Sequence, residues 1–215
     1  MISVAALNRS GRIAHRTRVL RLGALLVGAA ASVAACSQPV AGYREDPGAC
    51  TVVSDRSIAQ QLGPEAVVGP NTAKVSHTDS QSSSKCEWES FHPPGWGSPA
   101  NAKIIVLVRL KLTEDGAPDM AAAQSSYRTE NEDSTADAPP DVIGEFSKHK
   151  FEPGKPGDHQ VTEIDFRRAN AHVTVTYQGW GDKAMRDYFI PRDVQKAAAR
   201  DFARQALAAL GEPQR

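Results

Sequence analysis

The chain has 215 residues, its 25 lysines and arginines balance its 25 aspartates and glutamates, and 40% of its residues are hydrophobic. The charge is unevenly distributed: five of the arginines and none of the acidic residues precede Cys36, so the rest of the chain has a formal charge of −5. An acidic excess does not suit the phosphate backbone of nucleic acids, and a nucleic-acid partner is therefore disfavoured.

Residues 1–35 have the pattern of an export signal. Scattered arginines precede an uncharged, mostly apolar run over residues 22–35, which is shorter than the about 20 residues that a transmembrane helix needs. The run ends in Val33-Ala34-Ala35-Cys36, which resembles the bacterial lipobox. We therefore predict a lipoprotein signal peptide over residues 1–35 and a diacylglyceryl group on Cys36. Ordinary cleavage near Ala35, with a free cysteine, is the alternative.

The predicted lipidation of Cys36 indicates the cellular location of the domain. Two acyl chains hold a protein durably at a membrane, whereas one chain holds it only marginally. We therefore expect attachment through Cys36 to the extracytoplasmic face of the cell membrane. Residues 36–49 lack apolar periodicity and contain two prolines and two glycines, which predicts a flexible tether before a single folded domain over residues 50–211.

Two cysteines, Cys50 and Cys86, are left once Cys36 is acylated. An exported domain with two thiols most often joins them, and closing this loop would stabilise the fold by about 4 kcal/mol in the chain-entropy model. A zinc site is the alternative, but two cysteines this far apart without a neighbouring histidine pair lack zinc-ligand spacing. We predict a structural Cys50–Cys86 disulfide and no metal site.

The domain is expected to begin with a short helix. Ser54 or Asp55 can cap this helix, and Gly63-Pro64 ends it. Residues 65–84 are polar, and the serine-rich stretch 81–85 is interpreted as a loop.

Two strands are predicted next, over residues 86–90 and 102–112, with the proline- and glycine-rich loop 91–101 between them. In the second strand, apolar residues alternate with residues that become polar only towards its end. This pattern predicts that one face of the strand lies in the core and that a helix covers the first half of the other face.

Met120, Ala123 and Tyr127 recur at helical spacing and predict a second helix, followed by an acidic loop. Two strands, over residues 159–168 and 171–180, form a predicted hairpin. The last helix is expected to run from about Pro191 to Leu210. Its predicted inner face consists of Val194, Ala198, Phe202, Ala206 and Leu210.

The order of these features resembles a known family. The chain is similar to the actinobacterial lipoproteins of the domain of unknown function 3558 family in Val33–Cys36, Cys50, Leu62-Gly63, Cys86-Glu87-Trp88 and the C-terminal segment FARQALAAL. The resemblance implies a single α+β domain with one disulfide, in which short helices and a longer C-terminal helix pack against an antiparallel sheet. The family supplies no catalytic residue.

The sequence contains no clear pattern of enzyme chemistry. No two histidines are spaced for a helical metal pair, and neither a GxSxG elbow nor a phosphate-binding glycine loop occurs. Paired carboxylates of the glycosidase type would leave no signature in spacing. We therefore predict a protein that has no cofactor and is not an enzyme, with an envelope hydrolase as the less favoured alternative.

Two tryptophans favour a binding role. Trp96 lies in the loop 91–101 and Trp180 follows the predicted hairpin, and rigid aromatic rings in loops often form contact surfaces. Packing of both rings against a core edge is the alternative, and Trp88 is predicted to pack in the core beside the disulfide. We predict a module that binds a protein partner or a small envelope ligand through Trp96 and Trp180, with a passive structural lipoprotein as the alternative.

Overall fold

A single antiparallel sheet is the centre of the domain. The computed structural model describes residues 41–91, 100–131, 143–152, 160–181 and 191–214, and residues 37–215 form one compact unit. In chain order the elements are α1 (Asp55–Leu62), β1 (Val67–Val68), β2 (Ala73–Thr78), β3 (Gln81–Ser90), β4 (Ala100–Lys111), α2 (Met120–Asn131), β5 (Phe146–Glu152), β6 (Gln160–Arg168), β7 (Ala171–Gly181) and α3 (Arg192–Leu210).

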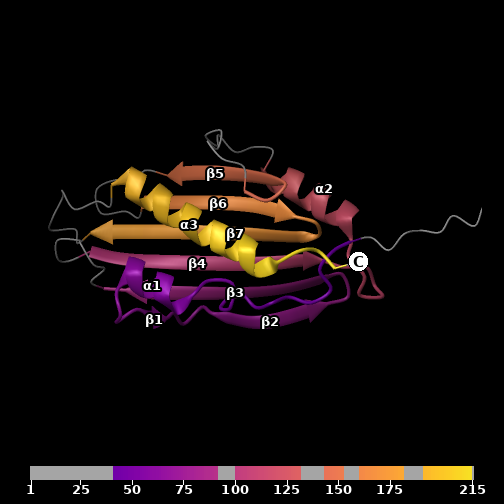
Figure 1. Ribbon diagram of the computed structural model, residues 1–215, viewed down its shortest axis with the longest axis horizontal. Coiled ribbons are helices and arrows are strands. Elements are labelled where there is room, and N and C mark those ends of the chain that lie inside the picture. Colours follow the sequence, from indigo (N-terminus) through magenta and orange to yellow (C-terminus); the bar gives the residue numbers. More distant parts are fainter. Residues whose placement is uncertain (1–40, 92–99, 132–142, 153–159, 182–190, 215) are drawn as a thin grey trace, which may run out of the picture. The chain divides into compact units, whose positions relative to one another are not determined.

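Seven strands of the described residues pair in the order β1-β3-β4-β7-β6-β5, and β2 also pairs with β3 (Figure 1). Every pairing is antiparallel. The predicted α+β class, with an antiparallel sheet, short helices and a longer C-terminal helix, is confirmed. Three strands, β1, β2 and β5, were not predicted.

The helices α1 and α3 cover one face of the sheet, which we call the helical face. α3 crosses the strands diagonally (Figure 1) and packs mainly on β6 and β7. Ile104, Val106 and Val108 of β4 are fully buried on this face, in one apolar cluster with Phe202 of α3. Buried alanines line α3 beside Phe202, and their small side chains let the helix lie close to the sheet.

The inner face of α3 differs from the prediction at one position. Val194 is 41% exposed, and the next residue, Gln195, is fully buried instead. The Gln195 amide is satisfied there, because its Nε2 donates to Oε1 of Gln160 at 2.7 Å and its Oε1 accepts from the hydroxyl of Thr162 at 3.4 Å. A hydrogen-bonded polar group can therefore take the inner position that the apolar repeat assigned to Val194.

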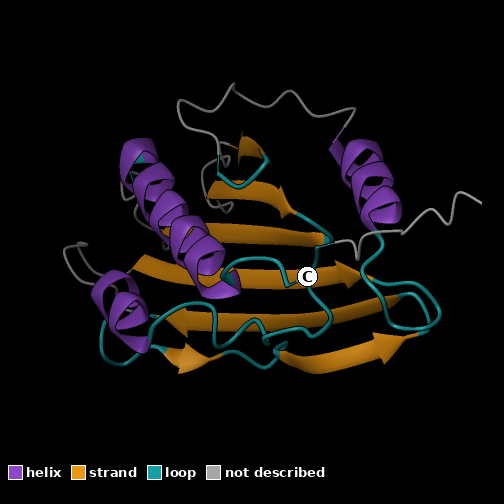
Figure 2. Cartoon of the chain, turned by 45° about the vertical axis from the view of Figure 1, so that its right-hand side comes forward, coloured by secondary structure: helices purple, strands orange, loops and turns teal. Residues whose placement is uncertain are grey.

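We call the opposite side of the sheet the open face; it carries Lys103, Ile105, Leu107 and Arg109 of β4 and their register partners. A helix was expected over the first half of β4 on this face, but no helix of the described residues lies there. The helix on the open face is α2, which contacts β4 at its far end, near Arg109. Figure 2 shows α2 well separated from α1 and α3.

The serines before Cys86 belong to β3, so the prediction of a loop over residues 81–85 is wrong. Ser82 and Ser84 are buried on the helical face. The Oγ of Ser84 accepts a hydrogen bond from the backbone N–H of Ala49 at 2.8 Å and donates to Oδ1 of Asp46 at 2.8 Å. Small hydroxyl side chains suit this strand because the segment before α1 packs directly over it.

Residues 41–49, assigned above to the tether, are likewise packed on the domain. Tyr43 is buried, and the backbone of Gly42 pairs with that of Gln214. Asn170, in the two-residue turn between β6 and β7, holds this segment: its Oδ1 accepts from the Tyr43 N–H at 2.7 Å. Its Nδ2 donates to the carbonyls of Tyr43 and Lys111 at 2.9 and 2.8 Å. The folded domain therefore begins before Cys50.

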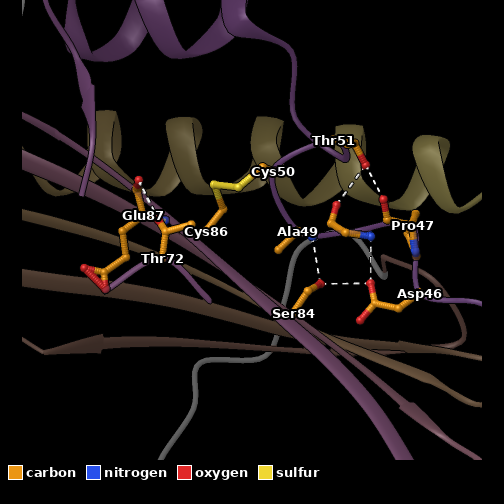
Figure 3. The surroundings of a disulfide bond; sticks show 10 residues. Asp46, Pro47, Ala49, Cys50, Thr51, Thr72, Ser84, Cys86 and Glu87 are labelled. Atoms are coloured by element: carbon orange, nitrogen blue, oxygen red, sulfur yellow. Dashed lines mark hydrogen bonds between the residues drawn. A yellow bond between two sulfur atoms is a disulfide. The ribbon is translucent and has the colours of Figure 1, made fainter. Parts of the chain in front are cut away.

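The predicted disulfide joins the segment before α1 to the middle of β3. Cys50 and Cys86 are bonded, with their Cα atoms 5.0 Å apart (Figure 3). Cys86 is fully buried, and Trp88 is buried in the same apolar cluster, as predicted. Among the described residues, no helix is both long and apolar enough to cross a membrane.

Candidate binding surface

Register arranges the side chains of the open face in rows that run across the strands. One row consists of Glu87, Ile105, Thr176, Glu163 and Lys150, on β3, β4, β7, β6 and β5 respectively. The next row towards the start of β4 consists of Glu89, Lys103, Gln178, Val161 and Glu152. Charged residues end both rows, and each row also has one charged inner member, Glu163 in the first row and Lys103 in the second.

α2 covers one end of this face. The ring of Tyr127 packs edge-on against His172 of β7, with ring centroids 5.2 Å apart. Two hydrogen bonds, of 3.0 and 2.7 Å, join the guanidinium of Arg109 to the carboxylate of Glu130. Burial raises the pKa of Tyr127 to about 12, so its hydroxyl stays protonated. The contacts that hold α2 on the sheet therefore include this ring contact, this bidentate ion pair and a hydrogen bond of 3.4 Å from the Tyr127 hydroxyl to the carbonyl of Asp165.

The part of the open face that α2 leaves uncovered contains a hollow of about 260 Å³. We call it the Glu163 hollow; it is lined by Ile105, Lys150, Glu152, Val161, Glu163, Thr176 and Gln178. All seven residues belong to the two rows described above, so four strands, β4 to β7, contribute to it. The backbone of the sheet fixes their spacing, which makes the hollow a preformed feature.

Glu163 has few partners for a half-buried carboxylate. Among the described residues it forms no ion pair, the hydroxyl of Thr176 donates to its Oε2 at 3.5 Å, and it shares a side-chain hydrogen bond with Asp165. Burial raises the pKa of Glu163, and the negative charge of Asp165 raises it further, while Lys150 acts in the opposite direction. The Lys150 ammonium itself lies 2.5 Å from Oε1 of Glu152.

The neighbouring acid on β6, Asp165, is much better satisfied. Its Oδ1 accepts a hydrogen bond of 2.6 Å from the hydroxyl of Thr174 and lies 3.4 Å from Nε2 of His172. Burial opposes ionisation of Asp165, but the interactions with His172 and Thr174 outweigh it and hold the pKa of Asp165 below its usual value. Of these two acids, Asp165 therefore carries the charge and Glu163 retains a proton more readily.

Glu87, at the β3 end of the same row, is a carboxylate with a structural role, because it is buried and ion-paired. Its side chain is only 1% exposed, and its oxygens lie 2.6 Å from the Lys85 ammonium and 3.5 Å from the Lys103 ammonium. Despite its burial, hydrogen bonds from Lys85 and Asn71 lower the pKa of Glu87. Glu87 and Glu163 thus differ in partners although they share one row.

None of the predicted site residues is among the residues that line the Glu163 hollow. Cys50 and Cys86 form the predicted disulfide on the helical face. Cys36 and Trp96 lie outside the described residues, and of Trp180 only the backbone is described, where it pairs with Asn101. Within the described residues, no group of three or more His, Cys, Asp or Glu side chains could hold a metal ion.

Glu163 was not among the predicted site residues. A signal was present in the hairpin: Glu163 and Asp165 alternate with the core residues Ile164 and Phe166, which places two acids on one outward face. The other walls of the hollow come from β4, β5 and β7, and the pairing of distant strands is what assembles them.

The whole chain was compared with known proteins. No family model, no curated protein and no solved structure matches it.

Proposed function

We propose that this chain is a lipid-anchored module on the extracytoplasmic face of the cell membrane, and that its open face binds a partner protein of the envelope. The lipobox pattern at Val33–Cys36 supports the anchoring, as does the resemblance to actinobacterial lipoproteins. The observation that carries the binding role is the Glu163 hollow: a preformed depression that combines apolar walls with a half-buried carboxylate to which no cation of the described residues is ion-paired.

The position of the first packed residues limits how far the domain can stand from its anchor. Only five residues separate Cys36 from Gly42, whose backbone is fixed to Gln214. Fully extended, this segment spans about 20 Å. The domain is therefore held close to the membrane by the end that carries the β6–β7 turn.

The hollow lies away from this end. Thr176 and Gln178 are six and eight residues along β7 from Asn170, which contacts the anchored segment. At about 3.3 Å per residue, the distance is roughly 20–25 Å. A partner in the envelope can therefore reach the hollow although the other end of the domain is near the lipid surface.

Hydrolysis of envelope material is a second candidate, because carboxyl groups with opposite pKa shifts often serve as acid and base. Glu163 and Asp165 have such shifts. Asp165, however, is outside the lining of the hollow, and its Oδ1 is engaged by Thr174 and His172. The second carboxylate in the lining, Glu152, is ion-paired with Lys150. This arrangement favours binding over hydrolysis.

The anchoring is tested by replacing Cys36. In an actinobacterial host grown with labelled palmitate, the wild-type chain is expected to carry the label and to sediment with membranes. Cys36→Ser is expected to lose both properties, and Ser37→Ala, at the next position, is the control that should retain them. Membrane association of an unlabelled Cys36→Ser protein would contradict the lipid anchor.

The binding role is tested by placing a photo-crosslinking amino acid at Gln178, in the hollow, and at Ala209, an exposed position on α3. Both proteins are exported in the same host and irradiated in intact cells. We expect a discrete adduct of defined mass from position 178 and none from position 209. Equal adducts at both positions, or none at either, would contradict the assignment of the open face as the binding surface.

A further inference from the structure

We infer that the Glu163 hollow takes up the side chain of a single lysine of the partner protein. This inference rests on the proposed function and adds to it the chemistry of the group that is bound. Three properties of the hollow carry it: its size, its charge and the arrangement of its apolar walls.

The hollow is large enough for one side chain of a partner protein but too small to enclose a typical small-molecule ligand. Sites that enclose small molecules usually measure about 300–1,000 Å³. The Glu163 hollow, at about 260 Å³, falls below this range, and its mouth opens on a broad sheet face. One long side chain fits such a depression, while the backbone that carries it lies across the neighbouring rows.

The charge of the hollow favours a cation. Two carboxylates, Glu152 and Glu163, line it together with one ammonium, that of Lys150, which is already paired with Glu152. Asp165 adds its negative charge beside Glu163. Glu163 is therefore left with a charge that no cation of the described residues neutralises by direct contact. The exported part of the chain also has an acidic excess, which attracts a basic partner.

The walls favour lysine over arginine. Ile105 and Val161 present apolar surface on the way to Glu163, and the four methylenes of lysine can lie along such surface while the ammonium reaches a carboxylate. A guanidinium makes its best contact with both oxygens of a carboxylate in one plane. The Thr176 hydroxyl already approaches Oε2 of Glu163, so a compact ammonium at the remaining positions fits better.

The test is an NMR titration of residues 37–215, which form one compact unit. The probe is Nα-acetyl-lysine methylamide, a lysine side chain on a blocked backbone, at pH 7. We expect saturable shifts at the amides of Ile105, Val161 and Thr176. The Nε-acetylated probe, which lacks the charge, is expected to bind at least about tenfold more weakly, and the matching arginine probe is expected to be weaker than lysine.

Variants assign the interaction to Glu163. Glu163→Gln should weaken lysine binding at least about tenfold. Glu89→Gln, which removes an acid of the neighbouring row that is ion-paired with Lys103 outside the hollow, should leave binding unchanged. Should Glu163→Gln fail to fold, acidification of the wild-type protein gives the same information. Lysine keeps its charge over the range in which Glu163 takes up a proton, so binding should fall.

Few titratable groups among the described residues can influence the protonation of Glu163 in this experiment. The groups that face Glu163 are Asp165 on its own strand and Lys150 and Glu152 on β5, while β4 and β7 present Ile105, Thr176 and Gln178, which do not titrate. Lysine binding that persists at the pH where Glu163 is neutral would overturn the inference. Equal shifts with the charged and the acetylated probe, or no shift with either, would also overturn it.

The two proposals fail in different ways. If position 178 gives its photo-adduct in cells but the lysine probe does not bind, the binding surface stands and the lysine assignment is wrong. If neither the adduct nor the probe is seen, the open face is not a binding surface and both proposals fall.

Discussion

The two faces of the sheet use alternate residues of the same strands, yet they bury them differently. On the helical face of β4, Ile104 and Val106 are fully buried beneath α3 and α1. On the open face, the intervening Ile105 and Leu107 are only partly buried, between threonines and charged side chains. The helical face therefore provides most of the apolar burial that stabilises the domain.

The open face keeps features that stability alone would not select. α2 covers one end of it, and the remaining area retains a hollow and a carboxylate that forms no ion pair with any described residue. Burying a charge without a partner costs stability, and such groups are often retained for binding or catalysis. The comparison teaches that the same strands can serve stability on one side and recognition on the other.

The largest expected effect is removal of the disulfide, which ties the first segment of the domain to the helical face. The double variant Cys50→Ala/Cys86→Ala should lower the free energy of unfolding by about 4 kcal/mol, because its unfolded chain is free of the cross-link. Denaturant unfolding of the wild type with and without reductant should give a similar difference. A loss below about 1 kcal/mol would mean that the segment before α1 is held mainly by other contacts.

A matched pair on β4 compares the two faces directly. Ile104→Ala, on the helical face, should cost about 3–4 kcal/mol, because it leaves a cavity in a close-packed core. Ile105→Ala, one residue further and on the open face, should cost less than about 1.5 kcal/mol. Both are measured by urea unfolding. Equal losses would show that the open face is packed as tightly as the core.

The turn between β6 and β7 is the next most sensitive point. Asn170→Ala should cost about 2 kcal/mol, because it leaves the buried backbone N–H and carbonyl of Tyr43 without their hydrogen-bond partner and removes one of the two bonds to the Lys111 carbonyl. Asn71→Ala, at an exposed asparagine, is the control and should cost much less. Hydrogen exchange at the Tyr43 amide should accelerate in Asn170→Ala. An unchanged exchange rate would mean that Asn170 does not hold this segment.

Short sequence patterns were enough to predict the three helices and the disulfide. The cap and stop residues predicted α1, apolar spacing predicted α2 and α3, and two cysteines in an exported domain predicted the disulfide. The β3 strand was predicted too short because Ser82 and Ser84 are polar, and the segment that buries them and bonds Ser84 is distant in the sequence. Polar residues with the pattern of a loop can therefore form a strand when a remote segment packs over them and, as at Ser84, bonds the hydroxyl.

The hollow could not have been predicted in the same way. The alternation of β6 puts Glu163 and Asp165 on one side of the hairpin, but the difference between their environments depends on side chains from other strands. Lys150 reaches the site from β5, a strand that was not predicted, and Ile105 reaches it from β4. Register across four strands determines which acid is left without an ion pair among the described residues.

The most direct test of the claim that the open face is kept for binding is the effect of two glutamates in one row on the free energy of unfolding. Since burial raises the pKa of Glu163, its ionisation opposes folding at neutral pH, and stability is regained as pH falls through that pKa. The pKa of Glu87 is lowered, so its contribution is present above the unfolded pKa of about 4.3 and is lost as pH falls.

The measurement is denaturant unfolding of wild type, Glu163→Gln and Glu87→Gln at pH 7 and again near pH 4. The account predicts that Glu163→Gln is more stable than wild type at pH 7, by about 1 kcal/mol or roughly 2–4 °C in Tm, and that this gain shrinks on acidification. Glu87→Gln should be destabilised by a similar amount at pH 7, because Lys85 loses its carboxylate partner and Lys103 keeps only Glu89. A Glu163→Gln protein that is less stable than wild type at pH 7 would contradict the account, since Glu163 would then serve the fold as Glu87 does.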